Sequence, residues 1–191
     1  MAGHGGDEGA ARALTADPDA SVRAAALGAL ARLGAMTASD VSAALADADP
    51  GVRRRACTAA IAFTGIDLVP LLADADDMVV EAAAWALGER GTAATATEAG
   101  AVDELIAIAG HHREPLCREA AVAALGAIGD PRGLAAILAA TKDRPAIRRR
   151  AVIALAPFDG PEVDAALAAA REDRDWQVRQ AAEDLSDPPT P

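Results

Sequence analysis

A unit of about 30 residues recurs along the chain, and this recurrence constrains the fold more than any single motif. A small or branched apolar residue marks one reference position in six copies: Val22, Val52, Val79, Cys117, Ile147 and Val178. Four positions later every copy has alanine: Ala26, Ala56, Ala83, Ala121, Ala151 and Ala182. Units that repeat in phase are expected to stack side by side, each burying its apolar face against its neighbours.

Each unit begins with a predicted helix of about three turns. Apolar residues recur 0, 4, 7, 8 and 11 positions after the reference position, which places them on one stripe of a helix. The pair Asp49-Pro50 predicts an N-cap followed by the first helical residue. Gly34, Gly91 and Gly129 lie twelve positions after the reference, where a helix commonly ends in the left-handed region.

A second, weaker helix is predicted in the rest of each unit. These helices are expected to start at Ser39, Asp67, Ala101, Pro131 and Pro161. The sequence therefore predicts an all-α protein, a right-handed α-solenoid of about five and a half helical hairpins, as a single domain over residues 1–191. A partial capping helix is expected at residues 8–15, with disordered tails at 1–7 and 187–191.

The composition agrees with a stack of closely packed helices. Hydrophobic residues make up 52% of the chain, but most of them are alanine, and there are two Phe, two Trp and no Tyr. Alanine has the highest helix propensity and buries little area, so the stability must come from close helix packing rather than from bulky side chains.

The charge and the termini limit the partners and the location. The formal net charge is −11, so a polyanion would be repelled unless the arginines gathered on one face, and cationic or neutral partners are favoured over nucleic acid. The N-terminus lacks the basic and apolar regions of a signal peptide, and no apolar run is long enough to span a membrane. Cys57 and Cys117 are expected to be reduced thiols of a cytoplasmic protein.

The idealised pattern of the first helix, DP-x-V-R-x-x-A-x-x-AL-G, resembles the HEAT repeat, and especially the short variant of phycobilisome lyases. The resemblance covers about residues 15–186. It implies that the first helix of each unit lies on the convex side, that the second lines the concave side, and that the stack serves as a docking surface.

The resemblance also implies a ladder of ion pairs between neighbouring units. An arginine follows the reference position in five copies: Arg23, Arg53, Arg118, Arg148 and Arg179. An aspartate lies five positions before the reference position in four copies: Asp17, Asp47, Asp74 and Asp173. A guanidinium suits such a link because it binds a carboxylate through two parallel hydrogen bonds.

Two runs of three arginines, 53–55 and 148–150, raise the alternative of a nucleic-acid site. Consecutive residues lie 100° apart on a helix, so each run cannot form one patch. Arg54 and Arg149 are expected on a solvated convex face, and Arg55 and Arg150 on the flank that faces the next repeat. The scarcity of aromatic residues for base stacking weakens the nucleic-acid reading further.

Acidic residues near the start of the second helices are the candidate partner-binding site: Asp67, Asp103, Glu104 and Asp164. Their simplest explanation is a favourable position at the positive end of the helix dipole. If the second helices line the concavity, the same residues form an acidic groove that suits a basic peptide or a protein patch.

Other candidates are less specific. Trp85 either binds a partner or is covered by the inserted segment 88–100, and Trp176 is expected to cover the end of the array. His111-His112 is read as a solvated turn rather than a metal site, and both cysteines as small core residues. No metal or cofactor is expected.

The leading hypothesis is a protein-interaction scaffold that holds a partner protein or a basic peptide on an acidic concave face. The alternative is an accessory enzyme of the lyase or isomerase type, because the most similar repeats occur in proteins that attach bilins. A small-molecule ligand is possible but has no support in the residues. Excision of alkylated bases, a third reading, would need a cationic groove with aromatic residues.

Overall fold

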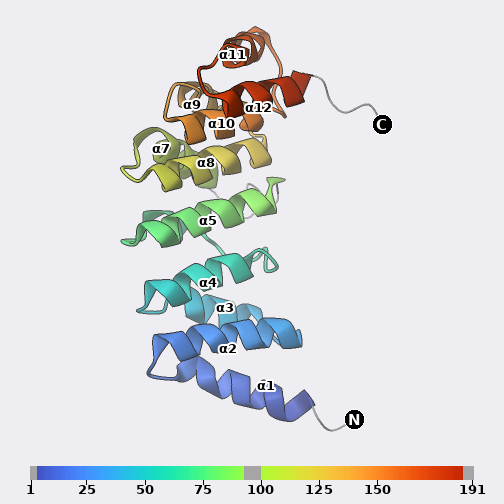
Figure 1. Cartoon of the computed structure of the whole chain (residues 1–191). Helices are drawn as coiled ribbons and strands as arrows, with labels where there is room; N and C mark the ends of the chain where they lie inside the picture. The colour runs from blue at the N-terminus through green and yellow to red at the C-terminus, as the bar shows by residue number, and fades with distance from the viewer. Residues whose placement is uncertain (1–3, 93–99, 187–191) are drawn as a thin grey trace.

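The computed structural model describes residues 4–92 and 100–186, which form helices and turns with no strand in these ranges (Figure 1). The first helices of the units are α2 (Ala20–Leu33), α4 (Pro50–Ala60), α5 (Asp77–Arg90), α8 (Pro115–Ile128), α10 (Pro145–Ala154) and α12 (Trp176–Ser186). The second helices are α3 (Ala38–Leu45), the 3-10 helix η2 (Val69–Ala73), α7 (Ala101–His111), α9 (Leu134–Ala140), which the 3-10 helix η3 (Pro131–Gly133) precedes, and α11 (Pro161–Arg171). Helix α1 (His4–Ala13) and the 3-10 helix η1 (Leu14–Ala16) precede them. None of the helices in the described ranges is long and apolar enough to cross a membrane.

The ends of the first helices agree with the predicted capping. The Asp49 carboxylate accepts hydrogen bonds from the amides of Gly51 and Val52, at 2.9 and 3.3 Å. Gly34 and Gly129 end α2 and α8 with φ of 66° and 69°, in the left-handed region that suits glycine. Gly91 differs from the prediction, because its φ of 56° is combined with a ψ of −134°, outside the left-handed helical region.

Two predicted segments differ from the structure. The second helix expected from Asp67 is only the short 3-10 helix η2, Val69–Ala73. At the N-terminus, α1 begins at His4, so residues 4–7 of the predicted disordered tail are helical.

Small residues allow the first helices to approach one another closely. A β-carbon on Gly88 of α5 would lie 2.9 Å from the Cα of Ala124 in α8. A β-carbon on Gly126 of α8 would lie 2.6 Å from both the Cα and the Cβ of Ala154 in α10. In both contacts a glycine nine positions after the reference meets an alanine seven positions after it, so the two interfaces share one register.

The layer of first helices lies on the inner side of the curved stack, which corrects the placement implied by the family resemblance. Successive first helices contact each other at every step. In the second layer α7 contacts η2 and α9 less extensively, and α9 and α11 make little or no contact. In a curved stack the more closely spaced layer lies inside the bend. Figure 1 shows the first helices along an arc that opens to the right, with α7, α9 and α11 on its outer side.

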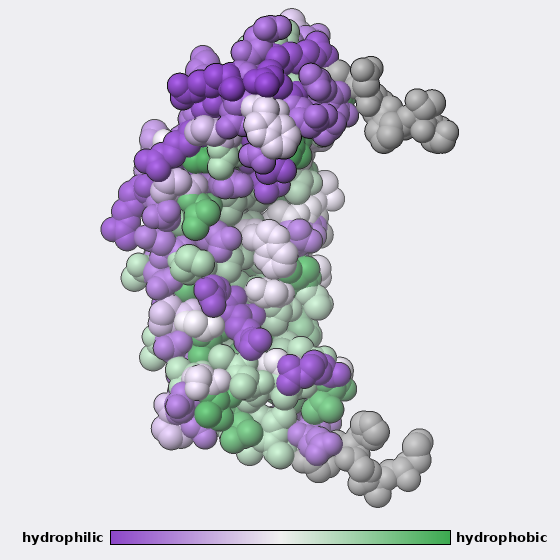
Figure 2. Space-filling model, viewed as in Figure 1, coloured by the Kyte–Doolittle hydropathy of each residue, from purple (hydrophilic) through white to green (hydrophobic). Residues whose placement is uncertain are grey.

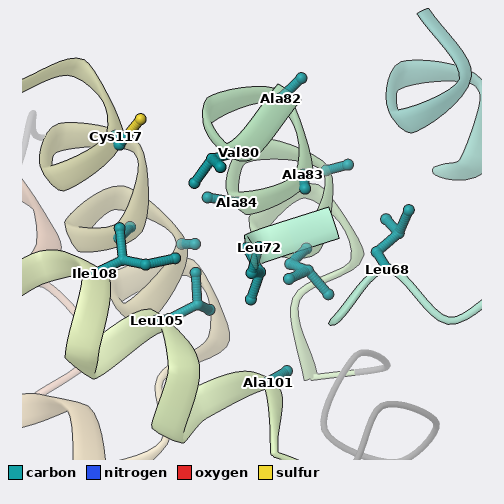
Figure 3. Close-up of a cluster of buried hydrophobic side chains, with 14 of the residues drawn as sticks. Leu68, Leu72, Val80, Ala82, Ala83, Ala84, Ala101, Leu105, Ile108 and Cys117 are labelled. Carbon is teal, nitrogen blue, oxygen red and sulfur yellow. The ribbon is translucent and has the colours of Figure 1, made fainter. Parts of the chain in front are cut away.

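The core lies between the two layers. In Figure 3, Leu105 and Ile108 of α7 point toward Leu72 of η2 and Val80 of α5, and all four are buried. Ala82 points away from α7, toward the other side of α5. The first helices therefore bury one stripe against the second layer and turn the opposite stripe, called here the inner face, toward the inside of the curve.

Candidate interaction surface

The predicted arginines and aspartates meet in pairs between neighbouring units. Arg23 donates two hydrogen bonds to the Asp47 carboxylate, at 2.7 and 2.6 Å, and Arg53 donates two to Asp74, both at 2.7 Å. The same guanidinium groups also donate to backbone carbonyls of the turn that precedes their own helix; for Arg53 these belong to Asp47 and Ala48. Each pair thus joins one turn to the next.

The ladder continues in the C-terminal half, where one of the two pairs is shifted by one residue. Arg148 donates to both oxygens of Asp173, at 2.8 and 2.7 Å. Arg118 pairs with Asp143 at 2.9 and 3.1 Å, although Lys142 occupies the expected position. Sequence reasoning missed Asp143 because it lies four rather than five residues before the reference position.

The ladder residues at the two ends of the series have no carboxylate–guanidinium partner among the described residues. The Asp17 side chain accepts only the amide of Asp19, and Arg179 donates to the carbonyls of Asp173 and Arg174. In the part of the chain that the structure describes, no further unit adjoins these positions on one side. The series therefore behaves as a chain of links between successive units.

The link is replaced at the third unit, where Val80 stands in place of arginine and is buried. There Asp77 of α5 accepts two hydrogen bonds from Arg113 of the following turn, at 3.2 and 3.1 Å. The Nε2 atom of His112 lies 3.9 Å from Asp77, and its Nδ1 atom accepts the amide of Glu114. The polarity of the pair is reversed, and His112 lies in the turn between α7 and α8.

The arginines lower the pKa values of their partner carboxyl groups. Hydrogen bonds from Arg23, Arg53, Arg118 and Arg148 hold the pKa of the paired aspartate below its usual range. The charged carboxylate is therefore the stable form at neutral pH, and the pairs depend on it.

Sequence reasoning missed two further arginines that join units. Arg12 donates to both oxygens of Asp40, at 2.6 Å each, and ties α1 to the start of α3. Arg90 is buried and donates to the carbonyls of Ala60 and Ile66. Ala60 is the last residue of α4, and Ile66 lies in the segment after it. Neither arginine follows a reference position, so the repeat pattern gave no signal for them.

A hollow with a volume of about 1010 Å³ lies on the inner face, over α2, α4 and α5. Its apolar lining includes Trp85 and Met78, whose residues are each 42% exposed. Figure 2 shows this side of the molecule, where apolar groups are exposed through the middle of the stack and hydrophilic groups gather toward the C-terminal end. Trp85 is thus exposed among the described residues; residues 93–99 of the predicted covering segment lie outside them.

Three arginines line the same hollow. Arg54 and Arg55 come from α4, and Arg32 from the last turn of α2. The expectation that Arg54 lies on a convex face is wrong, because the first helices form the inner layer. Arg55 points toward the preceding unit rather than the next one, since it donates to the carbonyl of Ala24 in α2.

A second, smaller hollow continues the inner face near the C-terminus. It is lined by Trp176, Ile153 and Arg149 among others. Trp176 is 65% exposed, so it lies open on the inner face instead of covering the end of the array. The neighbouring Arg150 also faces the preceding unit, at 3.6 Å from Glu119.

The acidic candidates lie on the outer layer and do not form a concave groove. Asp103 is paired with Arg132 at 3.2 Å, and the Asp67 carboxylate accepts the amide of Val69. Glu104 and Asp164 are exposed on α7 and α11. The prediction of an acidic concave face depended on the second helices lining it and is therefore corrected.

Both cysteines are free, buried and disfavoured as nucleophiles. Burial raises the pKa of Cys57 to about 12 and that of Cys117 to about 11. The Cys117 thiol donates to the backbone carbonyl of Asp77 at 3.1 Å. In the described part of the chain, no group of three or more His, Cys, Asp or Glu side chains is placed to hold a metal ion.

We therefore expect both thiols to resist modification in the native protein. A thiol reagent such as dithionitrobenzoate requires the thiolate and access to it. At pH 8 neither cysteine should react on the timescale of minutes, and both should react after unfolding in guanidinium chloride. Rapid release of chromophore by the native protein would contradict the burial of these thiols.

Solved structures of designed repeat proteins have the same fold. A designed armadillo repeat protein matches with a TM-score of 0.68 and 18% identity, covering 94% of this chain and 98% of its own. Another, in complex with the peptide (KR)4, matches with a TM-score of 0.71 at 18% identity and the same coverage. A third, from computationally designed armadillo repeat proteins for modular peptide recognition, has a TM-score of 0.67 at 19% identity, covering 94% and 98%.

Sequence comparison is informative for the C-terminal part of the chain. No curated protein matches the sequence significantly. The family model described as HEAT repeats matches residues 102–186, which contain α8 to α12 and nearly all of α7. The chain therefore has an all-α repeat fold of the HEAT and armadillo type, with HEAT repeats recognised over residues 102–186.

Proposed function

We propose that this chain is a protein-interaction scaffold that binds a segment of a partner protein along the inner face of its first helices. The observation that carries the proposal is the position of the exposed large apolar side chains. Met78, Trp85, Ile153 and Trp176 line the two hollows of the inner face. Leu116 occupies in α8 the register position that Met78 occupies in α5, and it is also exposed.

This arrangement supports binding of a polypeptide. Exposed aromatic and methionine side chains beside arginine are the composition of energetically dominant contacts in protein interfaces. A hollow that crosses three successive helices suits an extended segment rather than a compact small molecule. The stack supplies a rigid support, because each unit is joined to the next by close packing and by ion pairs.

The comparison structures support the mode of binding but not a charge preference. A designed armadillo repeat protein holds the peptide (KR)4, so a stack of this type can present a peptide-binding face. At 18% identity the likeness concerns the fold, and it carries no information on the side chains of that face. The basic partner expected from the sequence relied on acidic residues that lie on the outer layer here.

The alternative, an accessory lyase or isomerase, has no specific observation in its favour. It rests on the resemblance to the repeats of phycobilisome lyases, and the family match is to HEAT repeats in general. Such chemistry requires convergent polar groups of suitable pKa in one pocket. The inner hollows combine apolar side chains and arginines with the carboxylates of Asp49, Glu81 and Asp184. The Asp49 carboxylate is engaged in capping α4.

The proposal predicts that ligands of this chain depend on the inner face. Random displayed peptides of about 12 residues, which span roughly 40 Å when extended, can be selected on the immobilised protein. Substituting Met78→Ser and Trp85→Ser together should weaken the selected peptides at least about tenfold, since contacts of this kind dominate binding energy. Affinities can be measured by fluorescence anisotropy, with thermal unfolding as the check on folding.

The matched control lies on the outer layer. The pair Asp103→Lys and Asp164→Lys changes two exposed side chains and should leave the affinities unchanged. Peptides that lose affinity for the outer-layer variant but not for the inner-face variant would overturn the proposal and restore the acidic second helices as the binding site.

A further inference from the structure

Two arginines from different helices converge over Gly28 on the inner face. A β-carbon placed on Gly28 would lie 3.3 Å from Nη1 of Arg55 and 3.4 Å from Nη1 of Arg32. The absence of a side chain at Gly28 therefore leaves the space in which the two guanidinium groups meet. Arg54 lines the same hollow.

Within the described structure, neither guanidinium makes an ion pair. The Arg55 side chain donates to one backbone carbonyl, that of Ala24, at 3.0 Å. The nearby Asp49 carboxylate also lines the hollow, but it caps α4 by accepting two backbone amides. In contrast, the ladder arginines of the same two helices, Arg23 and Arg53, each bind a carboxylate.

Two like charges held close together repel each other, and an anion placed between them removes that cost. Arginine binds carboxylates with paired N–H donors, and the donors of two arginines around one point suit a carboxyl group. The apolar part of the hollow lies on the next helix, at Met78 and Trp85. Neighbouring helix axes lie about 8–10 Å apart, a distance that extended chain covers in about three residues.

Resting on the inner-face binding proposed above, we propose that the partner segment is acidic and apolar: its carboxylate binds Arg32 and Arg55 over Gly28, and a large apolar side chain about three to six residues away packs on Trp85 and Met78. A nucleic acid fits less well. The chain carries a net charge of −11, and Glu81 also lines the hollow, so a long polyanion is repelled where a single carboxylate is not.

The test uses three labelled peptides that are identical except at one pair of positions, which is acidic, neutral or basic. Each peptide carries two leucine–phenylalanine pairs, one about four residues before the variable pair and one about four residues after it, so that either chain direction can bind. By fluorescence anisotropy the acidic peptide should bind about tenfold more tightly than the neutral one, and the basic peptide more weakly than both. Added salt should reduce the difference.

Variants assign this preference to the two arginines. Arg32→Glu with Arg55→Glu should abolish the preference for the acidic peptide, and Arg32→Gln with Arg55→Gln serves where the first pair does not fold. The control, Lys142→Glu with Arg174→Glu, makes the same change in net charge at two exposed positions and should retain the preference.

The outcomes separate this inference from the proposed function. If neutral or basic peptides bind as tightly and Met78→Ser with Trp85→Ser still weakens them, the inner face binds a partner but the acidic preference is wrong. An acidic preference that survives the arginine substitutions, or no binding of the acidic peptide, overturns the inference as well. Displacement of the acidic peptide by a lower concentration of duplex DNA would show a nucleic-acid surface instead.

Discussion

Replacing Gly126 with alanine is expected to lower the free energy of unfolding by about 1–3 kcal/mol, the range for inserting a methyl group into a well-packed contact. The new β-carbon would lie 2.6 Å from the Cα and Cβ of Ala154 and 2.9 Å from its carbonyl oxygen. These are backbone or backbone-attached atoms, so α8 and α10 must move apart. Urea unfolding followed by circular dichroism measures the change.

The matched control is Gly9→Ala, in helix α1, where the added β-carbon would have no atom within 4 Å apart from its chain neighbours and the backbone of its own helix. There the higher helix propensity of alanine should raise stability, by up to about 1 kcal/mol. The two substitutions are chemically identical, but the added methyl group collides with α10 in one and meets open space in the other. We therefore expect opposite effects on the free energy of unfolding. Equal unfolding midpoints for both variants would contradict the close approach of α8 and α10.

Replacing Arg53 with alanine is expected to cost about 1–3 kcal/mol, the range for hydrogen bonds to charged groups. The change removes two bonds to Asp74 and two to backbone carbonyls, and it leaves a largely buried carboxylate without its cation. The adjacent Arg54→Ala is the control, since the Arg54 side chain makes no hydrogen bond or ion pair in the described structure. It should change stability by no more than about 0.5 kcal/mol.

The stabilisation by Arg53 should depend on pH. The arginine holds the pKa of Asp74 below its usual range, so the pair contributes fully above the ordinary aspartate pKa of about 3.9 and is lost as the pH falls through the lower folded value. The stability difference between the wild type and Arg53→Ala should therefore shrink below about pH 4. A difference that stays constant from neutral to strongly acidic pH would contradict the ion pair.

The repeat pattern predicts the helices, their caps and most of the ladder, because these depend on residues close in sequence and on one recurring phase. Arg23, Arg53 and Arg148 meet Asp47, Asp74 and Asp173 in that phase. Asp143 and Arg90 were not predicted because each joins neighbouring units from a position that does not recur in the other repeats.

The sequence also contained an unused signal for which layer lies inside the curve. Gly88 and Gly126 are both on first helices, where a side chain would collide with the next first helix. Spacing between layers, rather than the amphipathic pattern of a single helix, decides the direction of curvature. The convergence of Arg32 and Arg55, which lie 23 positions apart in the chain, depends on that packing and could not be derived from periodicity.

The position of the first helices on the inner side is the claim on which the proposed binding surface depends, and distances between spin labels test it directly. In a chain with Cys57→Ala and Cys117→Ala, one labelled pair replaces Thr58 and Ile153 on first helices three units apart. The other replaces the exposed Ala43 and Ala139 on second helices, also three units apart. Electron–electron double resonance should give a shorter distance for the first pair; a longer distance for it would place the second helices inside the curve and contradict the account.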